Sequence, residues 1–225
     1  MKKNYKQRID SIKKSNPFTS QTDIAYQIII EDILNNTLVQ GEKINQESLS
    51  QMLSMSRTPI RDAILKLETE GLIEKIDKGY QIYKTSIRDY VDFYEYRIRL
   101  ESFAVTLASR LISEEELDVL KDMLTGYIKA IDEKDYKAIS EWDMKFHKTI
   151  VLASKNPYLI HAYDHLKVKN QIFVNRLYKK DGFTHASKKK HIDIYKAIRD
   201  RDEKLAEETM VSHLKFYLYR LNNFE

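Results

Sequence analysis

The sequence predicts a mainly α-helical protein that contains one small β-hairpin in its first half. Glycine and proline are scarce, at 5 and 3 of 225 residues, whereas sheets joined by tight turns need more of both. Apolar residues recur at helical spacing along most of the chain, and two short strand-like segments around a turn occur only at residues 72–83. We therefore expect an N-terminal winged helix-turn-helix, with three helices and a hairpin, and a C-terminal all-helical antiparallel bundle of about six helices.

The composition excludes several classes of site and location. There is no cysteine, which rules out disulfides and thiolate metal sites and suits a reducing cytosol. The apolar runs are too short to span a membrane and no signal peptide precedes Gln21, so we expect a cytoplasmic protein with no membrane partner. The net charge of +4 is too small to indicate a nucleic-acid partner by itself.

Residues 1–20 are polar and basic. The charged residues are Lys2, Lys3, Lys6, Arg8, Lys13 and Lys14 against Asp10. We interpret this segment as a solvated, partly ordered N-terminal tail. The alternative is an arm that touches DNA phosphates.

Residues 21–84 form the predicted winged helix-turn-helix. Apolar residues at helical spacing predict helices over 22–39, 46–54 and 58–70. Two short strands follow around an Asp77-Lys78-Gly79 turn, which is a hairpin pattern. Thr85-Ser86 marks the boundary of the domain.

The third of these helices has the features of a recognition helix. Thr58 can cap it through its hydroxyl group, and Pro59 suits the first helical position, where a missing N–H costs nothing. Arg57 and Arg61 bracket this start, where a recognition helix meets base edges and phosphates. Gly71 ends the helix.

Residues 87–222 show only helical patterns. The predicted helices are 87–110, 114–132, 135–154, 157–179, 185–199 and 203–221. A capping box at Ser113–Glu116 opens the second, and Asn156-Pro157 opens the fourth. Each helix has an apolar stripe, which favours packing as an antiparallel bundle.

The segment from about residue 23 to residue 83 resembles the winged helix of GntR-type bacterial transcription regulators. The shared pattern is a leading amphipathic helix, the run from Ser56 to Ile64, then Leu67, the run from Glu70 to Ile73, and Gly79. The resemblance implies DNA contacts by Ser56, Arg57, Thr58 and Arg61, with the wing tip at Lys78 and Gly79 reaching the minor groove. Glu47 departs from the pattern, because many relatives have an arginine near this position.

The helical remainder resembles the FCD domain, the ligand-sensing domain of the FadR-like branch of that family. The matching residues are Arg97, Leu100, Glu101, Asp143, His147, Asn156, His191, Asp200, Ala206, Met210 and His213. The resemblance implies a dimeric repressor or activator on a double-stranded DNA operator. It also implies that a small metabolite, often a carboxylate, changes the DNA affinity.

Four of the matching residues form a candidate metal site. Asp143 and His147 are four residues apart, so they share one helix face, within about 6 Å of each other. His191 and His213 lie equally far before and after the break near residues 201–202, which brings them level in an antiparallel helix pair. Three imidazoles and one carboxylate suit a divalent transition metal, with Zn²⁺ first and Ni²⁺ as an alternative.

Other histidines offer an alternative to this set. His161 and His165 are also four residues apart and could lie opposite Asp143. The family pattern favours His191 and His213. Isolated buried histidines that only hydrogen-bond within the core are a further interpretation, and His185 falls in a predicted exposed loop.

A metal with three histidine ligands and one carboxylate ligand keeps open positions if it takes five or six ligands. A small organic acid could fill them. Arg97 is a candidate second anchor for the acid, because a guanidinium binds carboxylates at two points. An ion pair with Glu101, four residues on, is an equally good interpretation of Arg97, and Arg176 is a weaker anchor.

These features favour a metabolite-responsive transcription regulator that binds a near-palindromic operator as a homodimer. A regulator that senses the metal itself is the first alternative. A metal-dependent hydrolase fused to a DNA-binding head is the second, but the chain has no nucleophile elbow, phosphate loop or other catalytic signature. We therefore expect no enzyme activity.

Overall fold

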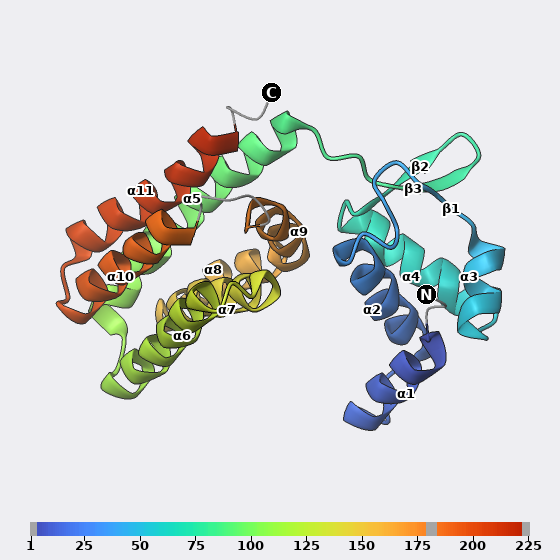
Figure 1. Cartoon of the computed structure of the whole chain (residues 1–225), viewed down its shortest axis with the longest axis horizontal. Helices are drawn as coiled ribbons and strands as arrows, with labels where there is room; N and C mark the ends of the chain where they lie inside the picture. The colour runs from blue at the N-terminus through green and yellow to red at the C-terminus, as the bar shows by residue number, and fades with distance from the viewer. Residues whose placement is uncertain (1–3, 179–183, 222–225) are drawn as a thin grey trace. The chain divides into compact units, whose positions relative to one another are not determined.

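The structure is a computed structural model that describes residues 4–178 and 184–221 (Figure 1). It divides into two compact units, Met1–Thr85 and Ser86–Glu225. Helices dominate both units, and the N-terminal unit alone carries strands among the described residues. This arrangement confirms the predicted fold class.

The N-terminal unit is a winged helix-turn-helix with one additional helix. Its elements are α1 (Tyr5–Ser15), α2 (Gln21–Leu34), β1 (Lys43–Ile44), α3 (Gln46–Leu53), α4 (Arg57–Thr69), β2 (Ile73–Ile76) and β3 (Gly79–Ile82). The three strands form an antiparallel sheet in the order β1-β3-β2. Ile28 on α2 packs with Ile60 and Ile64 on α4 in a fully buried core.

Helix α1 corrects the interpretation of residues 1–20 as a tail. Tyr5 donates a hydrogen bond to the carboxylate of Asp32 on α2 at 2.9 Å, and Arg8 pairs with the same carboxylate at 2.8 Å. Asn4 caps the helix through its side chain. The segment looks like a tail in the sequence because polar side chains, rather than an apolar stripe, attach most of it to α2.

Helix α4 begins one residue before the predicted range of 58–70, at Arg57. Ser56 is its N-cap residue and makes no side-chain capping bond, so the prediction of a Thr58 cap is wrong. Arg57 is the first helical residue, and Pro59 is the third. The proline is tolerated there because N–H groups of a first helical turn have no partner within the helix.

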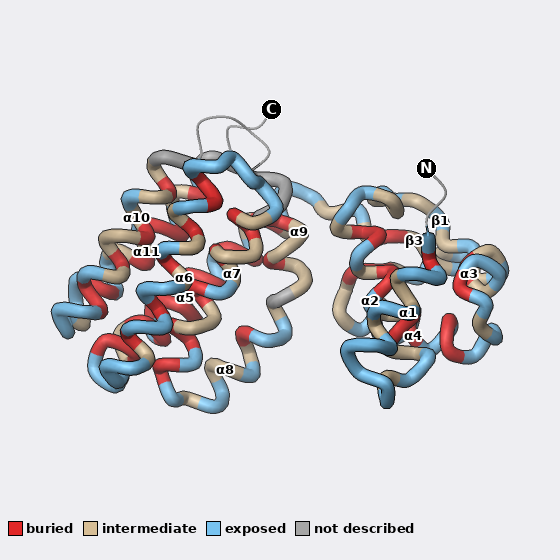
Figure 2. Tube along the Cα trace, turned by 60° about the horizontal axis from the view of Figure 1, so that its bottom comes forward, coloured by how far each residue is buried: buried red, intermediate tan, exposed pale blue. Residues whose placement is uncertain are grey.

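The C-terminal unit is an antiparallel helical bundle. Its elements are α5 (Ile87–Leu111), α6 (Glu114–Asp132), α7 (Tyr136–Ala153), α8 (Pro157–Asp164), α9 (Lys167–Tyr178), α10 (Thr184–Arg199) and α11 (Glu203–Leu221). Capping boxes at Ser86 and Ser113 open α5 and α6, and Asn156 with Pro157 opens α8. Figure 2 shows that buried residues line the inner sides of α5, α6, α7, α10 and α11.

The described residues of this unit contain seven helices rather than about six, because the predicted helix 157–179 is two helices. The chain turns at residues 165–166, where the Leu166 N–H bonds to the carbonyl of Tyr163 at 2.9 Å. Neither glycine nor proline marks this turn, so residue propensities gave no sign of it. The turn lets α9 pack against α7.

Helix α5 lies at the centre of the bundle and packs against α11 on one side and α7 on another. Helices α6 and α7 approach closely at Gly126, where an added Cβ would lie 2.5 Å from the Trp142 ring. No helix in the described part of the chain is long and apolar enough to cross a membrane.

Candidate functional site

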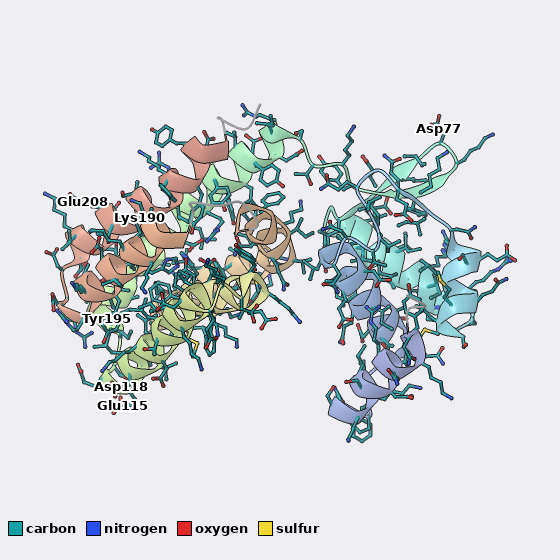
Figure 3. The ribbon with its side chains drawn as sticks, viewed as in Figure 1. Asp77, Glu115, Asp118, Lys190, Tyr195 and Glu208 are labelled. Carbon is teal, nitrogen blue, oxygen red and sulfur yellow. The ribbon has the colours of Figure 1, made fainter. Side chains whose placement is uncertain are left out.

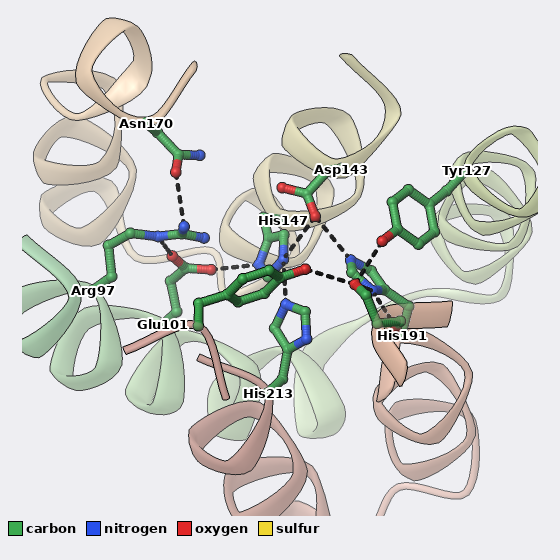
Figure 4. Close-up of polar contacts among 10 residues, drawn as sticks. Arg97, Glu101, Tyr127, Asp143, His147, Asn170, His191 and His213 are labelled. Atoms are coloured by element: carbon green, nitrogen blue, oxygen red, sulfur yellow. Dashed lines mark hydrogen bonds and ion pairs between the residues drawn. The ribbon is translucent and has the colours of Figure 1, made fainter. Parts of the chain in front are cut away.

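The four predicted metal ligands meet inside the helical bundle (Figure 4). Asp143 and His147 come from α7, His191 from α10 and His213 from α11. Each offers one ligand atom, and these atoms all lie within 4.8 Å of one another. All four side chains are buried. No other group of three or more such residues occurs in the part of the chain that the structure describes.

The ligand atoms form two close pairs. The Nε2 atoms of His147 and His213 are 3.1 Å apart, and Nε2 of His191 is 3.1 Å from Oδ1 of Asp143. Nε2 of His147 is 3.9 Å from the same Asp143 oxygen. The helix spacing therefore places the four donors as the sequence predicts.

Hydrogen bonds on the outer side of the cluster orient two of the imidazoles. Nδ1 of His147 lies 2.5 Å from Oε2 of Glu101, and Nδ1 of His191 lies 2.9 Å from the carbonyl oxygen of Ser187. Both partners accept hydrogen bonds, so both Nδ1 atoms carry the proton. In the neutral imidazoles, the Nε2 lone pairs then face the centre of the cluster.

This arrangement fits a metal ion. The lone pair of His191 Nε2 faces the acceptor Oδ1 of Asp143 at 3.1 Å, and that of His147 faces the same oxygen at 3.9 Å, and a cation between these groups would remove the repulsion. Nδ1 of His213 has no hydrogen-bond partner among the described residues. Three imidazole nitrogens and one carboxylate oxygen are ligands that Zn²⁺ and related divalent ions accept.

The environment keeps the ligands in the protonation states that a metal needs. Burial lowers the pKa of His191 and lowers that of His213 strongly, so both favour the neutral form. Burial alone would raise the pKa of Asp143, but its contact with His191 and the neighbouring imidazoles outweigh burial and lower that pKa to about 2. The site thus offers a carboxylate at Asp143 and neutral imidazoles at His191 and His213.

The alternative histidines lie elsewhere. His161 on α8 and His165, the residue that follows this helix, are exposed, and their Nε2 atoms face each other at 3.2 Å. The structure therefore does not bring this pair to Asp143. The side chain of His185 lies outside the described residues.

Arg97 on α5 is buried and makes the predicted ion pair with Glu101, at 2.5 Å from Nε to Oε1. Its Nη1 donates to Oδ1 of Asn170 at 2.7 Å, whereas Nη2 has no partner among the described residues. Arg97 therefore positions Glu101 and has one guanidinium nitrogen that no described residue contacts by a hydrogen bond. The side chain of the second predicted anchor, Arg176, lies outside the described residues.

Sequence reasoning missed several residues around this site. The hydroxyl groups of Tyr94 and Tyr163 are buried and have no partner among the described residues. Asn170 is buried next to Arg97. Only the packing of α5, α8 and α9 shows that these side chains lie around the site, since tyrosine and asparagine at these positions match no motif spacing.

The candidate DNA-binding residues are on the surface of the N-terminal unit. Ser56, Arg57, Thr58, Arg61, Lys78 and Gly79 are all exposed. Glu47 on α3 lies 3.8 Å from Arg57 in an exposed ion pair. Figure 3 shows Asp77 at the tip of the β2–β3 hairpin. Gly79 has a φ of 104°, which side-chain-bearing residues rarely adopt, so the hairpin turn requires glycine there.

Comparisons with known proteins identify both units. The family described as "Bacterial regulatory proteins, gntR family" matches residues 21–79, and the FCD domain matches residues 92–216. An uncharacterized HTH-type transcriptional regulator of Bacillus subtilis, YdhC, is 30% identical over 192 residues, which cover 84% of this chain and 85% of that protein. The Escherichia coli repressor RspR is 25% identical over 206 residues, which cover 89% and 88% of the two chains.

Solved structures show the same fold. Escherichia coli McbR/YncC matches with a TM-score of 0.77 and 19% identity, over 92% of this chain and 99% of that one. A putative GntR regulator from Rhodococcus sp. RHA1 also has a TM-score of 0.77, at 15% identity, over 92% and 100% of the two chains. The relatives are transcriptional regulators rather than enzymes. The chain therefore belongs to the GntR family of bacterial transcriptional regulators, with an FCD domain as its helical unit.

Proposed function

We propose that this regulator is a homodimeric, metabolite-responsive repressor or activator whose operator affinity is set by a metal-dependent site in its FCD domain. The buried cluster of Asp143, His147, His191 and His213 carries the proposal. A core without a ligand-binding role has no need for four convergent acceptor groups, because buried polar groups destabilise a fold unless they are satisfied. Since its partner is DNA, we place the protein in the cytoplasm.

Helix α4 would read the operator. Arg57 and Arg61 stand on its exposed side, at and after the N-terminus, where a recognition helix enters the major groove. Two copies related by a twofold axis would place one α4 in each half-site of a near-palindromic operator. Lys78 at the hairpin turn would reach the adjacent minor groove. Each base-contacting arginine should contribute about 1–3 kcal/mol to operator binding.

Asp143 and the three histidines would hold the metal through Oδ1 and their Nε2 atoms. The donor set suits Zn²⁺ best and also accepts Ni²⁺. The metal supplies open coordination positions and positive charge for the oxygen atoms of a small organic acid. Nη2 of Arg97 has no hydrogen-bond partner among the described residues, so Arg97 would serve as a second anchor for the same acid.

The effector would act by changing the relative populations of two arrangements of the FCD dimer. It must bind one arrangement of the FCD dimer more tightly than another, and its effect on DNA affinity cannot exceed that difference. The bundle provides a connection, because the ligands come from α7, α10 and α11, and α5 packs against both α7 and α11. Movement of the ligand helices would change the spacing of the two DNA-binding units.

Operator duplexes selected from a random library provide the test. Their affinity is measured with Zn²⁺-loaded protein, with chelator-treated protein, and with loaded protein plus a panel of small acids. We expect at least one acid to change the affinity of the loaded protein at least fivefold, and to have no effect on the protein with His191→Ala. A response that survives in that variant would exclude the cluster as the effector site.

A second candidate function is sensing of the metal itself. All four ligand residues are no more than 2% exposed, which favours a site that closes on an ion without an organic effector. In that case operator affinity should follow the free metal concentration, and no acid should alter it at saturating metal.

A further inference from the structure

Two histidines at the end of α8 form a pair that has no role in the proposed function. His161 lies in the last turn of α8, and His165 follows the helix as its C-cap residue. Residues four apart on a helix lie on the same face, and two histidines at this spacing can bind one metal ion. Both residues are exposed, so an ion in solution can reach them without any opening of the bundle.

The Nε2 atoms of the two rings lie close together. They are 3.2 Å apart, and the ring planes are nearly perpendicular, at 87°. Two nitrogen ligands of one tetrahedral Zn²⁺ ion lie about 3.3 Å apart, whereas a 90° angle between bonds of the same length would bring them to about 2.9 Å. The observed separation is therefore close to that of two ligands of one tetrahedral ion.

A hydrogen bond is the alternative explanation of this contact. One Nε2–H group can donate to the other Nε2 atom if the two rings adopt different tautomers. Water competes for that bond because both residues are exposed, so the bond contributes little free energy. A Zn²⁺ ion would replace this one bond with two metal–nitrogen bonds, which favours the metal-bound form when the ion is available.

The pair differs from the buried cluster in its number of ligands. Asp164, the residue before His165, forms an ion pair with Lys148 on α7. No third histidine or carboxylate in the described part of the chain lies within ligand distance of the pair. Water would therefore complete the coordination. With two protein ligands instead of four, the pair should fill only at Zn²⁺ concentrations well above those that load the cluster, so dialysis against a low Zn²⁺ concentration loads the cluster alone.

The backbone at this end of α8 is weakly held. The His165 N–H group reaches the carbonyl oxygen of His161 at 3.4 Å, which is long for a helical hydrogen bond. The next N–H group, of Leu166, instead bonds to the carbonyl of Tyr163 at 2.9 Å, where the chain turns toward α9. An ion bound by both histidines would join the two ends of this last turn.

We propose that His161 and His165 form a second, exposed Zn²⁺ site that stabilises the last turn of α8. The spacing of the two residues, the distance between their Nε2 atoms and the long backbone bond between them support the site. The inference goes beyond the proposed function and does not depend on a metal or an effector at the buried cluster.

Zn²⁺ titration of the full-length protein against a competing chelator tests the site. We expect a weak class of site, about one per chain, besides any tight class at the cluster. His161→Ala and His165→Ala should each lower the affinity of the weak class at least tenfold, because losing a direct ligand costs no less than losing a supporting group. Excess Mg²⁺, which prefers oxygen ligands, should not compete. Absence of a weak class, or its survival in both variants, would overturn the site.

Tyr158→Ala is the matched control, because Tyr158 is 84% exposed on the same helix and offers no metal ligand. This variant should keep the weak class of site. Alanine is the residue most compatible with a helix, so the substitutions on α8 should leave it folded. Loss of the weak class in the control as well would show that it reports the folding of α8 and not a bound ion.

Hydrogen exchange tests the stabilisation of the helix end. At a Zn²⁺ concentration tenfold above the Kd of the weak class, exchange of the His165 and Leu166 N–H groups should slow about tenfold in the unchanged protein. It should not slow in the His161→Ala protein. Equal slowing in both proteins would assign the effect to the cluster and overturn the stabilisation. His191→Ala should remove the tight class and His161→Ala the weak class, so failure at one site is distinguishable from failure at the other.

Discussion

Glu101 accepts a hydrogen bond from Nδ1 of His147 at 2.5 Å while it is bound by Arg97 on its other oxygen. Burial would raise the pKa of Glu101, but the charge of Arg97 and the hydrogen bonds from Arg97 and His147 lower it to about 2. The carboxylate is therefore ionised, holds His147 in the tautomer with Nε2 free, and strengthens that nitrogen as a ligand.

The first prediction is that Glu101→Gln weakens metal binding without removing any metal ligand. The neutral amide keeps the shape of the side chain but loses the charge that supports His147. Zn²⁺ affinity should fall about 10- to 100-fold, as is typical for such supporting groups. Chelator competition measures it, and Glu95→Gln, on the exposed side of the same helix, is the control. Equal affinities in both variants would count against the role of Glu101.

The second prediction concerns DNA recognition. Arg61→Ala should lower operator affinity by about 1–3 kcal/mol, since Arg61 is exposed on the first turns of α4. Fluorescence anisotropy at several salt concentrations measures this loss. Arg99→Ala removes an exposed charge from the FCD domain and should leave operator affinity unchanged. An Arg61→Ala protein that binds as well as the unchanged protein would mean that α4 is not the reading helix.

The third prediction concerns α1. Asp32 is 2% exposed and accepts from both Tyr5 and Arg8. Asp32→Ala removes the acceptor of the Tyr5 hydroxyl and one of the acceptors of Arg8, which costs about 1–3 kcal/mol. Helix α1 should then detach, and limited proteolysis should remove it faster while α2–α4 stay folded. Glu31→Ala removes an exposed partner of Arg8 and should have a much smaller effect.

The fourth prediction concerns Gly126, where a substitution that usually stabilises a helix should instead destabilise the protein. An exposed Gly→Ala change within a helix usually stabilises it by about 1 kcal/mol. At Gly126 the added methyl group would lie 2.5 Å from the Trp142 ring, so α6 and α7 must move apart. Gly126→Ala should therefore destabilise the FCD domain by about 1–3 kcal/mol in chemical unfolding. Thr125→Ala, one position earlier and exposed, should be neutral or slightly stabilising.

Several features of the fold followed from local sequence patterns. Capping residues at Ser113 and Asn156 fixed helix starts, and the Asp77-Lys78-Gly79 turn fixed the hairpin. Local patterns failed where long-range contacts decide the structure. Strand β1 has only two residues, which is too short to show the alternation of apolar and polar residues that predicts a strand. Helix α1 depends on the contact of Tyr5 with Asp32, which is 27 residues away in the sequence.

The same distinction applies to the site. Asp143 and His147 lie four residues apart on one helix, and His191 and His213 lie at similar distances on either side of the turn between α10 and α11. Helix geometry therefore predicts that the four side chains come together, and they lie together in the structure. Asn170 on α9 reaches Arg97 on α5 only through the packing of the bundle, and the same packing buries the hydroxyl of Tyr163 on α8. The four-residue spacing of Arg97 and Glu101 could not decide whether Arg97 pairs with Glu101 or remains available to bind an organic acid. The structure shows the pair, together with one Arg97 nitrogen, Nη2, that has no partner in the part of the chain that the structure describes.

The central claim is that the buried cluster holds a metal. The most direct test is elemental analysis of protein purified without chelators and then dialysed against Zn²⁺, for the unchanged protein and for His191→Ala. The account predicts about one equivalent of a divalent transition metal per chain in the unchanged protein and a large loss in the variant. No bound metal in the unchanged protein would contradict it and would leave the three histidines as members of a metal-free core.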